Sequence, residues 1–388
     1  MHRGGELLTM QKKKSSTIGG EKMSGLQIDP KTERLFFIDN LRIALTILVV
    51  LHHQAVLYAT NAVLLLFLML NQAFFMGLFF FLSGLFTPTS YERKGLRVFL
   101  KDRLMRLGIP IVIYIAVVSP IAQICMSFYR STEIGIQLLT SLTLGRYFNM
   151  IGIGPLWFLV MLLIFDVCYL LWRAATSNKP GKTGQFAAPK VRTICLFIVA
   201  LAFATYLMRM ITPINTWVLF FPSLSYLPQY VSFFILGTIA HQRDWLRGFP
   251  AKSGRTGFIL AIASTLILLP VAMSRLLGPV SDFIGLGTWR SGIYALWDST
   301  FAVGLCLGLI TFFRRRFDHL KNFGKSLQQS CFTVFIIHSV IIVVAAAILR
   351  DLQIMPLLKF VIAGCISVPL SFAVAWLIRK IPRANRIL

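Results

Sequence analysis

The segment FFIDNLRIALTILVVLHHQAVLYA (residues 36–59) decides the fold, because it is an apolar stretch of bilayer-spanning length that carries ionisable side chains. In a helix, residues advance by about 100° and about 1.5 Å, which places Arg42 and His53 on one face, about 16 Å apart. Asp39 lies on the same stripe and can pair with Arg42. Ionisable groups inside a membrane usually face a wet or protein-lined cavity. We therefore expect this stripe to be functional.

The composition places the chain among polytopic membrane proteins. Of its 388 residues, 56% are hydrophobic and 14% charged, and the mean hydropathy is +0.74. The alternation of a barrel strand is absent, so the spans must be helices, and the fold class is an all-α membrane bundle of about ten helices. The predicted spans are 38–59, 62–87, 108–129, 155–173, 193–211, 227–241, 257–275, 291–312, 327–349 and 357–378.

The net charge of +25 indicates topology, because the basic residues are concentrated in alternate loops. Positive loops stay cytoplasmic, which predicts that both termini are cytoplasmic and that the number of spans is even. A nucleic-acid partner is therefore not expected. The opposite loops are predicted to hold Arg130, Arg146, Arg209, Arg275, Arg290, Arg350 and Lys359.

Three regions are expected along the chain. Residues 1–34 form a flexible, basic cytoplasmic leader, within which Met1 or Met23 is the start. Residues 35–379 form a single transmembrane domain, interrupted by a Gly-, Pro- and Lys-rich linker over 174–192, and residues 380–388 form a basic tail. The six cysteines form no close pair, so we expect neither a disulfide framework nor a metal site.

Further polar residues accompany the stripe. Arg103 and Arg106 lie three residues apart before the third span, where they are either phosphate contacts or ordinary cytoplasmic anchors. His338 lies about 16 Å into its helix, close to the depth of His53, which makes it a plausible partner. Asp298 can orient a histidine, balance an arginine or make a helix–helix hydrogen bond. His52 is turned away from His53 by about 100° and is expected to act behind it.

Two other motifs are interpreted structurally. Trp157 and Phe158, in GPLWFL (154–159), are explained by the aromatic belt at the outer membrane face. Ser83 and Gly84, in FFFLSGLF (79–86), are expected to pack helices together.

The residue types of the stripe predict its chemistry. A buried, uncharged imidazole can accept a proton from an acceptor hydroxyl or amine, and the arginine fork suits a phosphate. Together they describe a tunnel that admits a long, phosphate-bearing donor. The structural alternative is an arginine that snorkels to the headgroups and a histidine satisfied by a backbone carbonyl. A transporter or flippase of a glycan or lipid precursor and a non-catalytic assembly partner of a polysaccharide synthase are the competing functions.

The chain resembles membrane-bound acyltransferase family 3, and in particular its stand-alone members similar to glucan succinyltransferase and intercellular adhesin modification proteins. The resemblance covers residues 34–348. The motifs that carry it are IDNLRIALTILVVLHH (38–53), FFFLSGLF with the Arg103 and Arg106 pair after it, GPLWFL, LPQYVSFFILGTIAHQRDW (227–245) and IIHSV (336–340).

The resemblance implies about ten helices, an acyl-CoA donor from the cytoplasm and an envelope glycan or lipid-linked acceptor at the outer side of a bacterial cytoplasmic membrane. By position it makes His53 the catalytic base, Arg42 a donor-binding or site-organising residue, and Arg103 with Arg106 the contacts to coenzyme A phosphates. His338 matches the late family histidine, although IHSV stands here instead of the more frequent His-Pro. No metal is implied.

Overall fold

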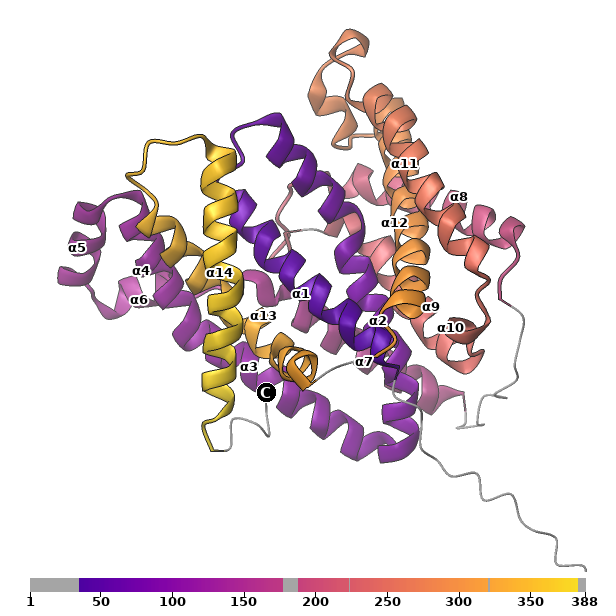
Figure 1. Ribbon diagram of the computed structural model, residues 1–388, viewed down its shortest axis with the longest axis horizontal. Helices are drawn as coiled ribbons and strands as arrows, with labels where there is room; N and C mark the ends of the chain where they lie inside the picture. The colour runs from indigo at the N-terminus through magenta and orange to yellow at the C-terminus, as the bar shows by residue number, and fades with distance from the viewer. Residues whose placement is uncertain (1–34, 177–187, 223, 320–321, 383–388) are drawn as a thin grey trace, which may run out of the picture. The chain divides into compact units, whose positions relative to one another are not determined.

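The computed structural model describes residues 35–176, 188–222, 224–319 and 322–382. Within these ranges the regular elements are helices, apart from one isolated bridge between Val218 and Phe221, which confirms the all-α class (Figure 1). The long helices are α1 (Phe36–Val56), α2 (Ala62–Arg103), α4 (Ser119–Arg130), α7 (Trp157–Ala175), α8 (Val191–Ile211), α9 (Leu227–Gln242), α11 (Ala251–Met273), α12 (Trp289–Arg316), α13 (Asn322–Ile348) and α14 (Pro356–Arg379). The short ones are α3 (Ile109–Ile113), α5 (Thr132–Thr140), α6 (Leu144–Asn149) and α10 (Trp245–Gly248).

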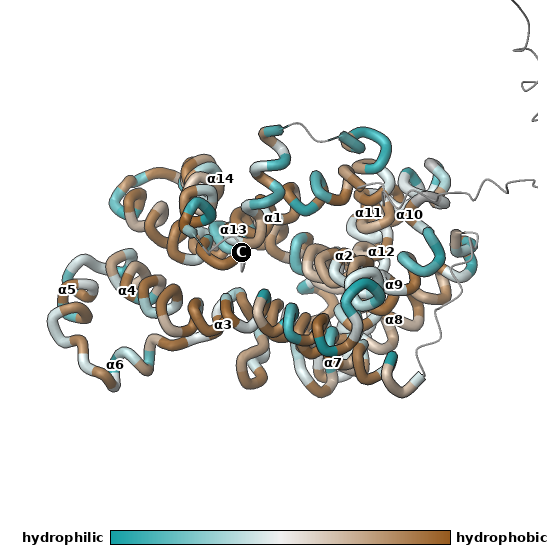
Figure 2. The backbone as a smooth tube through the Cα atoms, turned by 90° about the horizontal axis from the view of Figure 1, so that it is seen from below, coloured by the Kyte–Doolittle hydropathy of each residue, from teal (hydrophilic) through white to brown (hydrophobic). Residues whose placement is uncertain are grey.

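Eight helical stretches of the described residues are long and apolar enough to cross a membrane. The ten predicted spans all fall on helices, and two features account for the difference in number. The continuous stretch Ala62–Arg130 contains two predicted spans, and α9 has only 16 residues. Long hydrophobic stretches run through α3 and α7 among other helices, and hydrophilic residues gather in short segments (Figure 2). The number of crossings and the side of each terminus stay predictions.

The stretch from α2 to α4 changes course at glycine and proline. Gly95 lies inside α2 with a φ of 71° and a ψ of 172°, where the chain turns between two helical segments. Two π-helical segments follow, Leu104–Gly108 and Tyr114–Val118. Each ends two residues before a proline, Pro110 or Pro120, and the missing N–H and the ring of proline disturb the regular hydrogen-bond ladder there.

Helix α1 lies among other helices and so carries its polar stripe inside protein. It packs against α2, α12, α13 and α14 (Figure 1). Leu41 and Val49 of α1 join the largest hydrophobic core, and Ile43 and Val50 join a second core shared with α13 and α14. Apolar surface is therefore buried on several faces of α1, which holds the polar residues in register with their neighbours.

Hydrogen bonds place loops on common sides of the bundle. The Asn40 side chain donates to the carbonyls of Phe317 and His319 at 2.7 and 2.9 Å, so the start of α1 lies beside the end of α12. At the other end, Arg350 donates to the carbonyl of Phe128 at 2.8 Å, which joins the loops after α13 and α4. Both pairings agree with the predicted alternation of loops.

Helices α2 and α9 approach each other at glycine. A side chain at Gly84 would overlap the carbonyl oxygen of Phe234, and one at Gly237 would overlap the carbonyl oxygen of Phe81. The predicted helix-packing role of Gly84 is therefore confirmed. Such close contact gains dispersion energy, which is the main attraction between helices in lipid.

Two arginines predicted to lie in loops are buried instead. Arg209 and Arg290 are both 0% exposed, in the last turn of α8 and the first turn of α12. Arg290 donates to the carbonyls of Ala272 and Ser274 at 3.0 and 2.8 Å, which satisfies backbone groups at the end of α11. The loop assignment was wrong because charge counting ignores the partners that another helix supplies.

The predicted leader (1–34), residues 177–187 of the predicted linker and residues 383–388 of the tail lie outside the described residues.

Candidate active site

The two predicted histidines of α1 and α13 meet. The ring centroids of His53 and His338 are 4.9 Å apart, with the rings inclined at 60°. His338 is fully buried, and His53 is half-buried. The prediction that both lie at one depth is thus confirmed. His52 has its ring 5.4 Å from His53 and 4.9 Å from Phe75, on the side of α2.

Hydrogen bonds fix the tautomer of both rings. His53 Nδ1 lies 2.9 Å from the carbonyl oxygen of Val49, and His338 Nδ1 lies 2.8 Å from that of Phe335. Because a carbonyl oxygen can only accept, each Nδ1 carries the hydrogen, and each neutral ring keeps a lone pair on Nε2. His338 Nε2 is buried without a hydrogen-bond partner in the described part of the chain. The pair therefore offers proton acceptors inside the bundle.

Arg42 also faces protein. Its guanidinium lies 4.6 Å from the ring centroid of Phe86 on α2, a cation–π contact. Asp39 of α1 and Cys331 of α13 are close enough to interact with it electrostatically. Because α1 is one uninterrupted helix, Arg42 and His53 lie along it at the spacing that the sequence predicts, both toward α13.

Arg103 has an acidic partner. Its Nε lies 3.1 Å from a carboxylate oxygen of Asp166 on α7, and its guanidinium lies over the ring of Phe99. Asp166 also accepts a hydrogen bond from Thr87 at 3.1 Å and is 1% exposed. The structure shows that it fixes Arg103 between α2 and α7.

Arg106 differs from Arg103 in exposure and partner. Its side chain is 58% exposed and forms an ion pair with Asp102 at 3.0 Å, whereas the side chain of Arg103 is 19% exposed. Between them lies the start of the π-helical segment. Of the two predicted phosphate contacts, Arg106 is the more accessible one.

Asp298 is engaged by Arg209. The Arg209 guanidinium donates to Asp298, and the rings of Tyr226 and Tyr294 lie 5.0 Å from the guanidinium. Ser299 donates to the other carboxylate oxygen of Asp298 at 3.4 Å. Of the roles considered for Asp298, balancing an arginine is the one observed. In the described residues it makes no hydrogen bond to a histidine.

The aromatic residues of GPLWFL lie in the core and not in a membrane-surface belt. Trp157 and Phe158 are 8% and 7% exposed, so the belt interpretation was wrong. The ring of Phe158 lies 5.7 Å from that of Phe335, which in turn lies 5.9 Å from His338. The motif thus supports the helix face that carries His338. Only the pairing of α7 with α13 reveals this contact.

A cavity of about 370 Å³ opens beyond the end of α1 that carries His53. Its lining combines aromatic, hydroxyl and cationic groups: Leu57, Tyr58, Thr60, Tyr129, Arg350, Ile354, Pro356 and Lys359. The hydroxyl of Tyr58 is buried and has no hydrogen-bond partner in the described ranges. Arg42, His53 and His338 are not part of this lining, so the predicted continuous tunnel stays a prediction.

Comparison with known proteins identifies the family. The family model described as an acyltransferase domain (Acyl_transf_3) matches residues 35–376, nearly the whole described chain. No curated protein and no solved structure matches significantly. The matched region contains the histidine pair, Arg42 and the Arg103–Asp166 contact. The chain is therefore a membrane protein of acyltransferase family 3.

Proposed function

We propose that this acyltransferase moves an acyl group of acetyl or succinyl type from cytoplasmic acyl-CoA to a hydroxyl of a cell-envelope glycan or lipid-linked acceptor (EC 2.3.1.-). The bacterial cytoplasmic membrane is the proposed location. The observation that carries the proposal is the orientation of the His53 ring beside that of His338. Its Nδ1 donates to the carbonyl of Val49, which leaves Nε2 of the neutral ring as the proton acceptor. A base so placed matches acyl transfer to a hydroxyl.

In the proposed reaction, His53 Nε2 takes the proton of the acceptor hydroxyl while that oxygen attacks the thioester carbonyl. The C–O ester bond forms and the C–S bond breaks. The coenzyme A thiolate then takes the proton from the His53 imidazolium and leaves as the free thiol. His338 positions the site, because its ring packs 4.9 Å from that of His53 and limits the orientations of His53.

The donor is proposed to enter from the side that carries the basic loops. Arg106 would meet the phosphates first, because its side chain is 58% exposed. Arg103, fixed by Asp166, and Arg42, stacked on Phe86, would guide the donor toward the histidines. Arginine suits this task, because its planar fork binds phosphate through paired hydrogen bonds.

The acceptor is proposed to approach through the 370 Å³ cavity at the opposite end of α1. Tyr58 and Tyr129 supply ring faces and hydroxyl groups, and Arg350 and Lys359 supply positive charge. Sugars offer both apolar ring faces and hydroxyls, so a cavity with this mixture suits a glycan, most of all an anionic one.

The experiment incubates purified protein with labelled acyl-CoA and a membrane extract, and compares the wild type with His53→Ala. Labelled acceptor and free coenzyme A in equal amounts, formed only by the wild type, are expected. Movement of a glycan or lipid without loss of thioester would instead identify a transporter. An envelope phenotype that survives His53→Ala would identify an assembly partner.

A further inference from the structure

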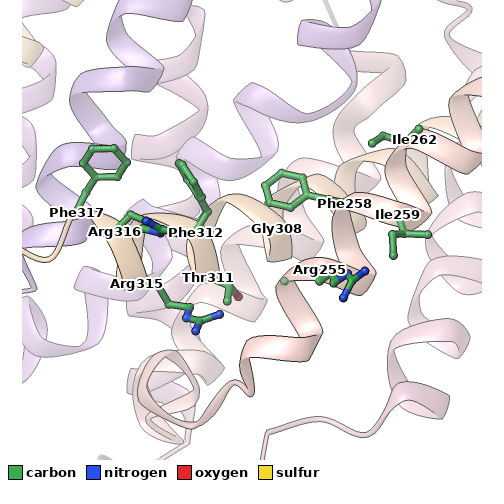
Figure 3. A pocket seen from close by; sticks show the side chains of 11 residues that line it. Arg255, Phe258, Ile259, Ile262, Gly308, Thr311, Phe312, Arg315, Arg316 and Phe317 are labelled. Atoms are coloured by element: carbon green, nitrogen blue, oxygen red, sulfur yellow. The ribbon is translucent and has the colours of Figure 1, made fainter.

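A second and larger groove lies between α11 and α12, away from the histidines. It has a volume of about 940 Å³ and is lined from both helices by Gly254, Arg255, Phe258, Ile259, Ile262, Gly308, Thr311, Phe312, Arg315, Arg316 and Phe317 (Figure 3). Its basic end contains the last turn of α12. That turn lies beside the start of α1, because Asn40 donates to the carbonyl of Phe317. The groove therefore opens at the side of the bundle that the sequence predicts to be cytoplasmic.

The described lining of the groove carries positive charge and no negative charge. Arg255, Arg315 and Arg316 line it, and no acidic residue does. In the part of the chain that the structure describes, the guanidinium groups of these three arginines make no hydrogen bond or ion pair. The neighbouring Arg314 is different, because it donates to the carbonyls of Leu246 and Phe249 and so ties α12 to the segment before α11. The groove thus has three cations available for an anion.

Beyond its arginines, the groove becomes apolar toward the predicted interior of the membrane. On α11, Arg255 is followed at helical spacing by Ile259 and Ile262, which are 55% and 59% exposed. On α12, the stripe that leads inward from Arg315 contains Phe312, 44% exposed, and Gly308. Each helix therefore presents a cation at the membrane edge and apolar surface beyond it.

This order of groups matches one molecule in a bilayer, a phospholipid with an anionic headgroup. We propose that the groove binds an anionic phospholipid, whose phosphate is held by Arg255, Arg315 and Arg316 and whose acyl chain lies against Ile259, Ile262 and Phe312. Gly308 has no side chain, so the ring of Phe258 on α11 lies directly against α12 and forms part of the apolar wall. Basic pockets between helices at the cytoplasmic face are typical lipid sites. The proposal does not depend on the proposed acyl transfer.

The test is a lipid titration of the purified full-length protein in detergent, followed by native mass spectrometry. The probes are dioleoyl phosphatidylglycerol and dioleoyl phosphatidylcholine, which have the same chains. The variant is Arg255→Gln/Arg315→Gln/Arg316→Gln, and its matched control is Lys190→Gln/Arg192→Gln/Lys380→Gln, which removes the same charge from other exposed basic positions. Each arginine is expected to contribute about 1 kcal/mol of binding free energy. The triple arginine variant should therefore bind phosphatidylglycerol about a hundredfold more weakly.

Phosphatidylcholine binding and the control variant are expected to stay close to the wild type. A second variant, Ile262→Gln, keeps the arginines and tests the apolar wall, and it is expected to weaken phosphatidylglycerol binding but not the binding of glycerol 3-phosphate. An equal loss of phosphatidylglycerol binding in the triple arginine variant and in its control would overturn the proposal. Displacement of the lipid by coenzyme A or inorganic phosphate would also overturn it. Because no acyl transfer is measured, failure here leaves the proposed enzymatic function untouched.

Discussion

Two polar pairs inside the helix bundle have opposite characters. His53 and His338 join α1 to α13, and Arg209 and Asp298 join α8 to α12. Both pairs bring together residues far apart in the chain and place them inside apolar helices. In the first pair the rings are held by backbone carbonyls, and His338 Nε2 is buried without a partner in the described residues. In the second, a cation meets an anion between two tyrosine rings.

The difference separates a reactive site from a structural one. An ionisable residue in an apolar helix gives the same sequence signal in both cases. In the Arg209–Asp298 pair the charge is balanced and covered by aromatic rings, so it fixes two helices. In the histidine pair a lone pair is kept free, and a free lone pair can take a proton from a substrate.

The largest expected effect is on catalysis. His53→Ala removes the proposed base and is expected to lower the rate of acyl transfer about 10²- to 10⁴-fold, because that is the usual contribution of general base catalysis. Thermal unfolding in detergent should change little. His52→Ala is the matched control, with a loss of less than about tenfold. Nearly full activity of His53→Ala would show that the histidine pair is not reactive, and the contrast with the structural Arg209–Asp298 pair would then be lost.

The second effect is on stability. Asp298→Asn leaves Arg209 as an unbalanced buried charge and is expected to lower the free energy of unfolding by about 3–5 kcal/mol. Denaturant or thermal unfolding in detergent measures it. The double variant Arg209→Met/Asp298→Leu removes both charges and should recover most of the loss. A single variant as stable as the wild type would contradict the structural role.

The third effect concerns pH and His338. Protonation of the His53 imidazole removes its lone pair, so the rate is expected to fall as the pH is lowered, with the slope of a single proton. His338→Gln is expected to cost about tenfold in rate and to keep this acid limb, because the base is still present. The rate is measured across the pH range at constant ionic strength. A flat profile in the wild type would exclude His53 as the base.

The smallest expected effect tests whether Arg106 contributes to binding of the acyl-CoA donor. Arg106→Gln removes an exposed contact and is expected to raise KM for acyl-CoA about fivefold, with little change in kcat, since one exposed charge contributes about 1 kcal/mol. High salt should shrink the difference, because exposed charges are screened. Arg97→Gln, which removes another exposed arginine one helical segment earlier, on α2, is the control. An equal change in KM for Arg97→Gln would deny Arg106 a specific role.

The sequence predicted the helices well, because a bilayer imposes apolar length and internal hydrogen bonding on each segment separately. It was less successful where neighbours matter. It assigned Trp157 to the aromatic belt at the membrane surface and Arg209 and Arg290 to loops, whereas all three side chains are buried. In each case the deciding contact comes from another helix, and no local pattern records it.

By itself, the sequence determined an all-α membrane protein of acyltransferase family 3 and a stripe of Asp39, Arg42 and His53 on one helix face, because helical periodicity is a local property. The depth of His338 in its helix also offered it as a partner for His53. Only the tertiary structure decided that the two rings meet and that Asp166 pairs with Arg103 and Arg209 with Asp298. Partners join helices that are far apart in the chain, so they depend on how the helices pack, which one-dimensional spacing does not specify.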